Sequence, residues 1–142
     1  MIGVSDNGDA CVEWTLPGRL DSARTARRAV RDTFRDWRLD PELAELAALL
    51  VSELVTNSLR YAHGPVGLRL TRVPEPHGSL PPRHALLVEV SDPVPDPPRA
   101  RPAGPDDEGG RGLRLVACAA RRWGTRKGLT GKTVWFELPL PG

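Results

Sequence analysis

Apolar residues alternate with polar ones over short stretches and recur every three or four positions over longer ones, which predicts both strands and helices. Alternation predicts a strand over Cys11–Leu16, ended by a Pro-Gly pair. Asp21 or Ser22 then caps a helix that runs to about Trp37. The spacing of its apolar residues predicts one face in the core: Leu20, Ala23, Ala26, Val30, Phe34 and Trp37.

A second helix begins at Asp40-Pro41-Glu42, with a capping Asp, a Pro at the first helical position and an acidic first turn, and continues to about Ala62. Five further elements are predicted, in chain order: a strand at Val66–Val73, a strand at Ala85–Ser91, a helix at roughly Leu113–Arg122, and strands at about Trp123–Lys127 and Lys132–Leu138. This order predicts an α+β fold. The expected architecture is a two-layer sandwich in which a mostly antiparallel sheet carries about three helices on one face.

Size and composition predict a single globular domain over residues 1–142, with residues 1–10 as a loose tail. The chain is 39% apolar and 27% charged. No stretch approaches the roughly 18 apolar residues of a membrane span, and the N-terminus lacks the pattern of a secretory signal. The two cysteines, Cys11 and Cys118, form no CxxC motif, which excludes a zinc ribbon and favours a cytoplasmic protein.

Glycine and proline are unusually frequent, with 14 and 15 residues, and ten of the prolines lie between Pro74 and Pro105. They predict a loose connector at Pro74–Pro82 and a long irregular segment over residues 92–109. Proline fixes φ, so this second segment is expected to be stiffer than a glycine-rich loop.

The formal net charge of +2 gives no strong attraction to nucleic acid, and direct nucleic-acid binding is not expected. Of 20 basic residues only Lys127 and Lys132 are lysines. Five arginines repeat at helical spacing along the first helix, as either a solvated face or a docking surface for an acidic partner: Arg24, Arg28, Arg31, Arg35 and Arg38.

The second helix carries Glu53 and Asn57, four positions apart, on a face that is otherwise apolar. An unpaired buried polar group costs a few kcal/mol, so both side chains need partners. They either pair with each other or cap a loop, or they belong to a site. In a site, the Asn oxygen is a ligand suited to Mg²⁺ and the Glu can accept a proton from an attacking hydroxyl.

Three later segments carry further candidates. Asp92 ends an apolar strand, as a turn residue or as an acceptor for an exocyclic amine such as that of adenine. Gly109-Gly110-Arg111-Gly112-Leu113 stands at a helix start, where glycines and free N–H groups can contact phosphate and Arg111 can add its charge. Thr133 follows a glycine turn and can present a hydroxyl to the same place. Neither a P-loop nor a Rossmann fingerprint is present.

Taken in this order, four segments resemble the ATP-binding domain of the GHKL superfamily, whose Bergerat-type fold is a two-layer α/β sandwich. The closest resemblance is to small bacterial anti-sigma-factor serine/threonine kinases and their single-domain actinobacterial relatives. The resemblance runs from roughly Val12 to Leu138 and rests on these motifs: Glu53-Leu54-Val55-Thr56-Asn57, Val90-Ser91-Asp92, Gly110-Arg111-Gly112-Leu113 and Gly131-Lys132-Thr133-Val134-Trp135-Phe136.

The resemblance implies an ATP–Mg²⁺ site in which Asn57 ligates the metal and Glu53 is the general base. Asp92 would bind the adenine amino group, with support from the Thr133 hydroxyl, and residues 92–109 would form a lid. The implied nucleotide-binding set is Asn57, Asp92, Gly110, Arg111, Gly112, Leu113 and Thr133. The implied reaction is transfer of the ATP γ-phosphate to a serine or threonine of a partner protein.

One departure separates two hypotheses about function. The family's adenine motif reads Asp-x-Gly-x-Gly, but both glycines are replaced in Asp92-Pro93-Val94-Pro95-Asp96. The first hypothesis is an anti-sigma-type regulator that phosphorylates an antagonist and binds a sigma factor or a similar partner. The second is a non-catalytic ATP-binding or protein-interaction module on the same scaffold. Relatives commonly form homodimers, although no interface is evident in this sequence.

Overall fold

The computed structural model describes residues 2–4, 10–61, 64–74, 83–92, 108–128 and 131–141. Of residues 2–4, 61 and 108–112 only the backbone is described. The elements are β1 (Ile2–Val4), β2 (Ala10–Leu16), α1 (Ser22–Asp36), α2 (Pro41–Tyr61), β3 (Val66–Pro74), β4 (His84–Asp92), α3 (Glu108–Ala119), β5 (Arg122–Gly128) and β6 (Gly131–Pro139).

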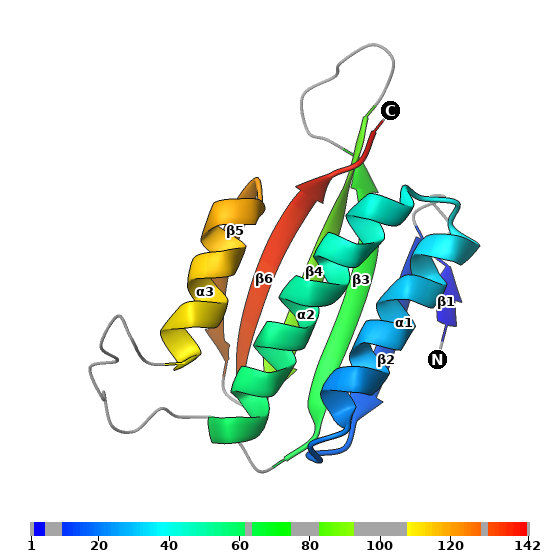
Figure 1. Ribbon diagram of the computed structural model, residues 1–142. Helices are drawn as coiled ribbons and strands as arrows, with labels where there is room; N and C mark the ends of the chain where they lie inside the picture. The colour runs from blue at the N-terminus through cyan, green and yellow to red at the C-terminus, as the bar shows by residue number, and fades with distance from the viewer. Residues whose placement is uncertain are drawn as a thin grey trace.

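Within the described residues, six strands form one sheet in the order β1-β2-β3-β4-β6-β5, and every neighbouring pair is antiparallel. The three described helices cover one face of this sheet, with α2 lying between α1 and α3 (Figure 1). No helix among the described residues packs on the other face. The predicted two-layer α+β sandwich is therefore confirmed.

The core lies between the sheet and the helices. Alternate residues of β3 and β4 are buried on the helix side, as at Leu68, Leu70 and Val88. They pack in one hydrophobic cluster with α1 residues such as Phe34 and α2 residues such as Val51. Most of the stabilisation of such a fold comes from this burial, at about 1.5–3 kcal/mol for each large apolar side chain.

The start of α2 follows the prediction closely. The Asp40 side chain accepts a hydrogen bond from the Glu42 backbone N–H at 3.0 Å, and Pro41 is the first helical residue. At α1 the predicted N-cap position is confirmed at Asp21, although its side chain makes no cap hydrogen bond. The prediction is wrong for Leu20, which is 92% exposed. The helix begins at Ser22, after a turn at Arg19, so Leu20 lies outside the helical face that its spacing implied.

Two boundaries also differ from prediction. Ile2–Val4 pair with β2 as an edge strand, so these residues are not part of a loose tail. Helix α3 spans Glu108–Ala119 and not Leu113–Arg122, so the glycine-rich segment forms its first turn. The helix ends early because Arg122 enters the β5–β6 ladder opposite Glu137. The predicted connector and the predicted lid fall mostly outside the described residues, at 75–82 and 93–107.

Candidate functional site

One end of the sheet brings the predicted site segments together. Helix α2 ends at this end, immediately before β3, and Gly67 near the start of β3 pairs with Ser91 near the end of β4. The start of α3, the end of β5 and the start of β6 lie at the same end (Figure 1). The fold therefore collects Asn57, Asp92, the first turn of α3 and Thr133 from four separate parts of the chain.

Asn57 has an unusual environment. Its Oδ1 atom is buried and has no hydrogen-bond partner within the described part of the structure. On α2 it lies roughly 140° around the helix from Ser52, at 100° per residue. Ser52 contacts α1, so Asn57 lies on the opposite flank, toward α3. An unsatisfied buried acceptor costs about 1–3 kcal/mol, and this cost marks Asn57 as a candidate ligand-binding residue.

Glu53 lies one helical turn before Asn57 on the same flank of α2 and is partly exposed. Among the described residues it makes no ion pair or hydrogen bond, and the Asn57 oxygen accepts none. The alternative in which these two side chains pair with each other is therefore not observed. A free carboxylate beside a buried amide oxygen is a suitable arrangement for a proton acceptor next to a cation ligand.

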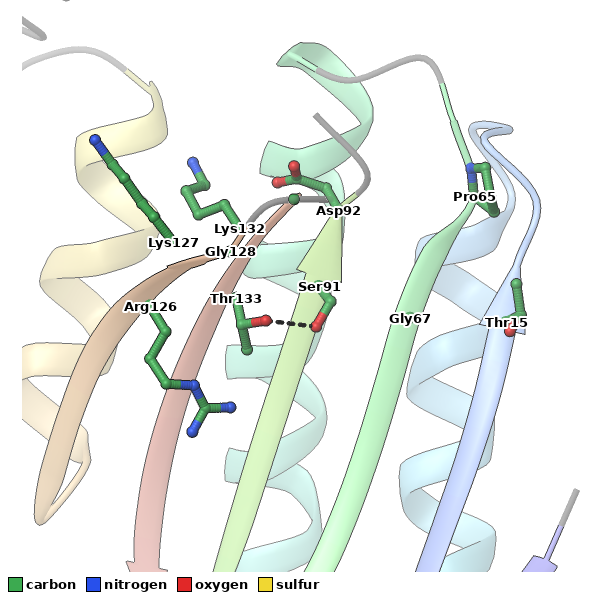
Figure 2. Close-up of a pocket in the computed structure, with 11 residues that line it drawn as sticks. Thr15, Pro65, Gly67, Ser91, Asp92, Arg126, Lys127, Gly128, Lys132 and Thr133 are labelled. Atoms are coloured by element: carbon green, nitrogen blue, oxygen red, sulfur yellow. Dashed lines mark hydrogen bonds between the residues drawn. The ribbon is translucent and has the colours of Figure 1, made fainter. Parts of the chain in front are cut away.

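The end of β4 and the start of β6 carry polar groups on both faces of the sheet. The Ser91 and Thr133 hydroxyls are hydrogen-bonded at 2.8 Å on the face without helices (Figure 2). Because side chains alternate along a strand, the next residue of β4, Asp92, and its register partner Lys132 belong to the helix side. The Thr133 hydroxyl therefore bonds to Ser91 on the face opposite to the one to which Asp92 belongs.

A hollow of about 510 Å³ lies at this end of the sheet. Most of its lining residues, such as Gly67, Ser91 and Thr133, belong to the face without helices, and Asp92 at the end of β4 also lines it (Figure 2). Its basic side chains all come from the β5–β6 hairpin: Arg126, Lys127 and Lys132. The sequence alone did not assign the two lysines to this end of the sheet. The strand register decides which residue lies opposite Asp92, and the register is not visible in the sequence. The signal available was that both lysines of the chain flank one glycine turn.

The first turn of α3 provides backbone N–H groups at the same end of the molecule. Gly110, Arg111 and Gly112 lie in this turn, where only the backbone is described. Leu113 is partly buried and packs against the hydrophobic core. The turn therefore has the polarity that favours an anion, with unpaired N–H groups and the positive end of the helix dipole.

The fold and this arrangement of side chains define an ATP-binding domain of the histidine kinase-like class. The chain belongs to the histidine kinase-like ATPase domain family, which matches residues 16–138. The resemblance to the GHKL superfamily is thereby confirmed, and membership implies ATP binding, generally with Mg²⁺. No curated protein matches the chain.

Among solved structures, the chain is similar to the RsbU and RsbW domains of Rv1364c from Mycobacterium tuberculosis, with a TM-score of 0.62 and 18% sequence identity. The match covers 92% of this chain and 32% of that one, so the chain spans about a third of that protein. This likeness supports the fold. Among the described helices, none combines the length and apolar character needed to cross a membrane.

Proposed function

We propose that the protein is a cytoplasmic regulator of the anti-sigma-factor type that binds ATP–Mg²⁺ and phosphorylates a serine or threonine of an antagonist protein. Family membership supports the nucleotide, and the likeness to a structure containing an RsbW domain supports the regulatory class. The observation that carries the proposal is the buried, unpartnered Oδ1 of Asn57, at the end of the sheet where Asp92 and the first turn of α3 meet.

The residues fit the proposed cofactors. Asn57 would hold Mg²⁺, which supplies charge neutralisation on the phosphates when bound. Asp92 would accept a hydrogen bond from the adenine amine, and the backbone N–H groups at 110–113 would contact phosphate. Thr133 would support Asp92 indirectly, because its hydroxyl is hydrogen-bonded to Ser91 on the opposite face and so holds the end of β4 that carries Asp92.

Glu53 would act on the acceptor hydroxyl. As the serine or threonine oxygen bonds to the γ-phosphorus, the bond from that phosphorus to the β–γ bridging oxygen breaks and ADP leaves. The hydroxyl proton passes to the Glu53 carboxylate, which is partly exposed and free to reach it. Positioning and electrostatics supply most of the rate in such transfers.

Arginines on α1 form a candidate partner surface on the other flank of α2. A second hollow of about 510 Å³ is lined by Arg24, Arg27, Arg28, Arg31, Asp32 and Arg35. Arg31 donates two hydrogen bonds to Glu45 at 2.9 Å, which lowers the pKa of Glu45, and Arg27 donates to Ser52 at 3.0 Å. Arg24 and Arg28 make no ion pair with any described residue. Exposed, unpaired guanidinium groups are suited to the carboxylates of a sigma factor or antagonist.

The Asn57→Ala variant tests the site. Because the substitution removes an unsatisfied buried acceptor, we expect the Tm to be unchanged or higher while the Mg²⁺-dependent part of ATP affinity falls at least about tenfold, or 1.4 kcal/mol. Calorimetric titration of ATP with Mg²⁺ and with EDTA measures the difference. The matched control is Thr56→Ala on the α1 flank of the same helix, with unchanged affinity. Equal ATP affinity in the wild type and in Asn57→Ala would reject the site.

The second candidate function is a non-catalytic ATP-binding or protein-interaction module, favoured by the replacement of both glycines after Asp92. A phosphotransfer assay with the wild type and the Glu53→Gln variant separates the two functions. Radiolabelled ATP is supplied together with an antagonist that co-purifies with the chain. In a kinase, Glu53→Gln keeps ATP affinity and loses phosphotransfer. In a binding module, the wild type transfers no phosphate to begin with.

A further inference from the structure

The arginines of α1 crowd one strip of that helix. At 100° per residue, four of them fall within about 60° of the helix circumference: Arg24, Arg28, Arg31 and Arg35. Arg27 lies beside this strip and lines the same hollow of about 510 Å³. Like charges three or four positions apart destabilise a helix, so this arrangement costs stability unless anions offset it.

Acidic side chains compensate only part of this charge. Arg31 donates two hydrogen bonds to Glu45 at 2.9 Å, and Arg35 pairs with Asp32 at 3.6 Å. Arg27 donates to a neutral hydroxyl on α2 at 3.0 Å, which leaves its charge in place. Two of the five guanidinium groups in the hollow are therefore neutralised by a carboxylate, and three are not.

The three uncompensated groups meet at the end of the hollow near the start of α1. They are Arg24, Arg27 and Arg28, and none of them forms an ion pair with a described residue. The first turn of α1 contains no acidic residue that could neutralise them. Arg27 and Arg28 lie three and four positions after Arg24, and such helix neighbours have Cβ atoms about 5–6 Å apart. Their side chains can therefore converge on one anionic group.

The chemistry of these groups favours a phosphate over a carboxylate. A carboxylate carries one charge, and a single bidentate guanidinium satisfies its two oxygens. A phosphorylated serine or threonine carries a charge of about −1.5 to −2 at pH 7 and presents three strong acceptor oxygens. Three guanidinium groups around one hollow match that charge and that number of acceptors, and the planar fork of arginine fits phosphate oxygens bidentately.

We propose that Arg24, Arg27 and Arg28 form a phosphoryl-binding site that recognises a phosphorylated serine or threonine side chain. The inference rests on the proposed function, because such a side chain on the antagonist is the product of the proposed transfer. The site lies on α1, on the flank of α2 opposite Asn57 (Figure 1). A phosphorylated antagonist held there competes with an acidic partner for the same arginines.

The test uses a short, end-capped glycine peptide that contains one phosphoserine, and matched peptides with aspartate or serine at that position. Their dissociation constants are measured by NMR titration of the whole chain. We expect the phosphoserine peptide to bind at least about tenfold more tightly than the aspartate peptide, a difference of 1.4 kcal/mol. The serine peptide lacks the charge and is expected to bind more weakly than both.

A double variant locates the site. Arg24→Gln with Arg28→Gln is expected to weaken binding of the phosphoserine peptide at least about tenfold. Its Tm should be unchanged or higher, because the substitutions remove like-charge repulsion, and this shows that the fold is intact. Arg83→Gln with Arg114→Gln removes the same charge at exposed positions outside the hollow and should keep the wild-type affinity.

The outcomes separate this inference from the proposed function. Equal affinity for the phosphoserine and aspartate peptides, or an equal loss in the two double variants, overturns the inference. Inorganic phosphate is the other source of the same group, and it lacks the peptide contacts. If it binds as tightly as the phosphoserine peptide, recognition of a phosphorylated side chain is likewise overturned. If the peptide binds as expected but the chain neither binds ATP nor transfers phosphate, the proposed function fails and the phosphoryl-binding site stands.

Discussion

Arg38 occupies a backbone conformation that glycine normally provides. Among the described residues other than glycine, only Arg38 has a positive φ, at 57°. It follows the end of α1, where the Leu39 N–H donates to the Phe34 carbonyl at 2.8 Å and the Arg38 N–H donates to Arg35 at 3.1 Å. These two bonds are those of a Schellman motif, with Arg38 at the position where glycine is preferred.

Arg38→Gly is therefore expected to stabilise the fold. The left-handed conformation costs about 1–2 kcal/mol for a residue with a Cβ, and glycine removes this cost. Glycine also makes the unfolded chain more flexible, which lowers the stabilisation by about 0.5–1 kcal/mol. The free energy of unfolding should rise by about 0.5–1 kcal/mol, measured by urea titration. Arg38→Ala keeps the Cβ and is the control, with no comparable gain. A loss of stability in Arg38→Gly would contradict this account of the turn.

At the residue scale, interactions between residues close together in the chain were predictable. Asp40 caps α2 as predicted, because an N-cap side chain bonds to a backbone N–H only two or three residues further on. The anomaly at Asn57 was also visible, since a polar residue on an apolar helix face needs a partner. The exposure of Leu20 was not predictable from spacing alone, because the turn at Arg19 sets where α1 begins.

Among the elements, an ion-pair row crosses the face of the sheet that has no helices. Arg69 on β3 pairs with Glu13 on β2 at 2.5 Å and approaches Glu89 on β4 at 3.9 Å, and Glu89 also pairs with Arg126 on β5. The Glu89 side chain is only 11% exposed, whereas that of Glu13 is 55% exposed. Glu89 is thus the central acceptor of the row, shared by two arginines.

Glu89→Gln is expected to destabilise the protein by about 1–3 kcal/mol, because Arg126 loses its charged hydrogen-bond partner and Arg69 loses the second of its two carboxylate partners. The half-exposed arginines recover some hydration, so the loss stays below the roughly 3–5 kcal/mol of a fully buried pair. Glu13→Gln is the matched control, with a loss of about 0–1 kcal/mol for an exposed pair. Urea unfolding of both variants measures the contrast. Equal losses at the two positions would show that burial of Glu89 contributes nothing.

Element order and type were predictable from the sequence, but the positions of elements relative to each other were not. Alternation and helical spacing located β2 through β6 and the first two helices to within a few residues. The limits of α3 were missed because tertiary packing overrides the low helix propensity of its three glycines. The pairing of Lys132 with Asp92 depends on the β4–β6 register, which is set by burial of one sheet face and by contacts far apart in the chain.

For the whole molecule, the helix layer separates two candidate surfaces. Asn57 lies on the α3 flank of α2, whereas the arginine hollow follows α1 on the opposite flank. A partner bound at α1 would therefore leave the proposed nucleotide site accessible. Helix α2 contributes to both surfaces, through Glu45 and Ser52 on one flank and Glu53 and Asn57 on the other. This separation predicts that the two binding functions can be removed independently.

Reversal of the two unpaired arginines tests that independence. We expect the double variant Arg24→Glu with Arg28→Glu to weaken binding of an acidic partner at least about tenfold, with a smaller effect at high salt. ATP affinity should stay at the wild-type value, because both arginines line the hollow on α1 and neither lines the hollow that includes Asp92. In a pull-down, the wild type should retain a sigma factor or antagonist that this variant does not retain. The dissociation constant of that partner is then measured for both proteins. Arg83→Glu with Arg114→Glu makes the same change in net charge at exposed positions outside the hollow and should retain the partner. If both double variants lose the partner equally, net charge and not the α1 surface determines binding.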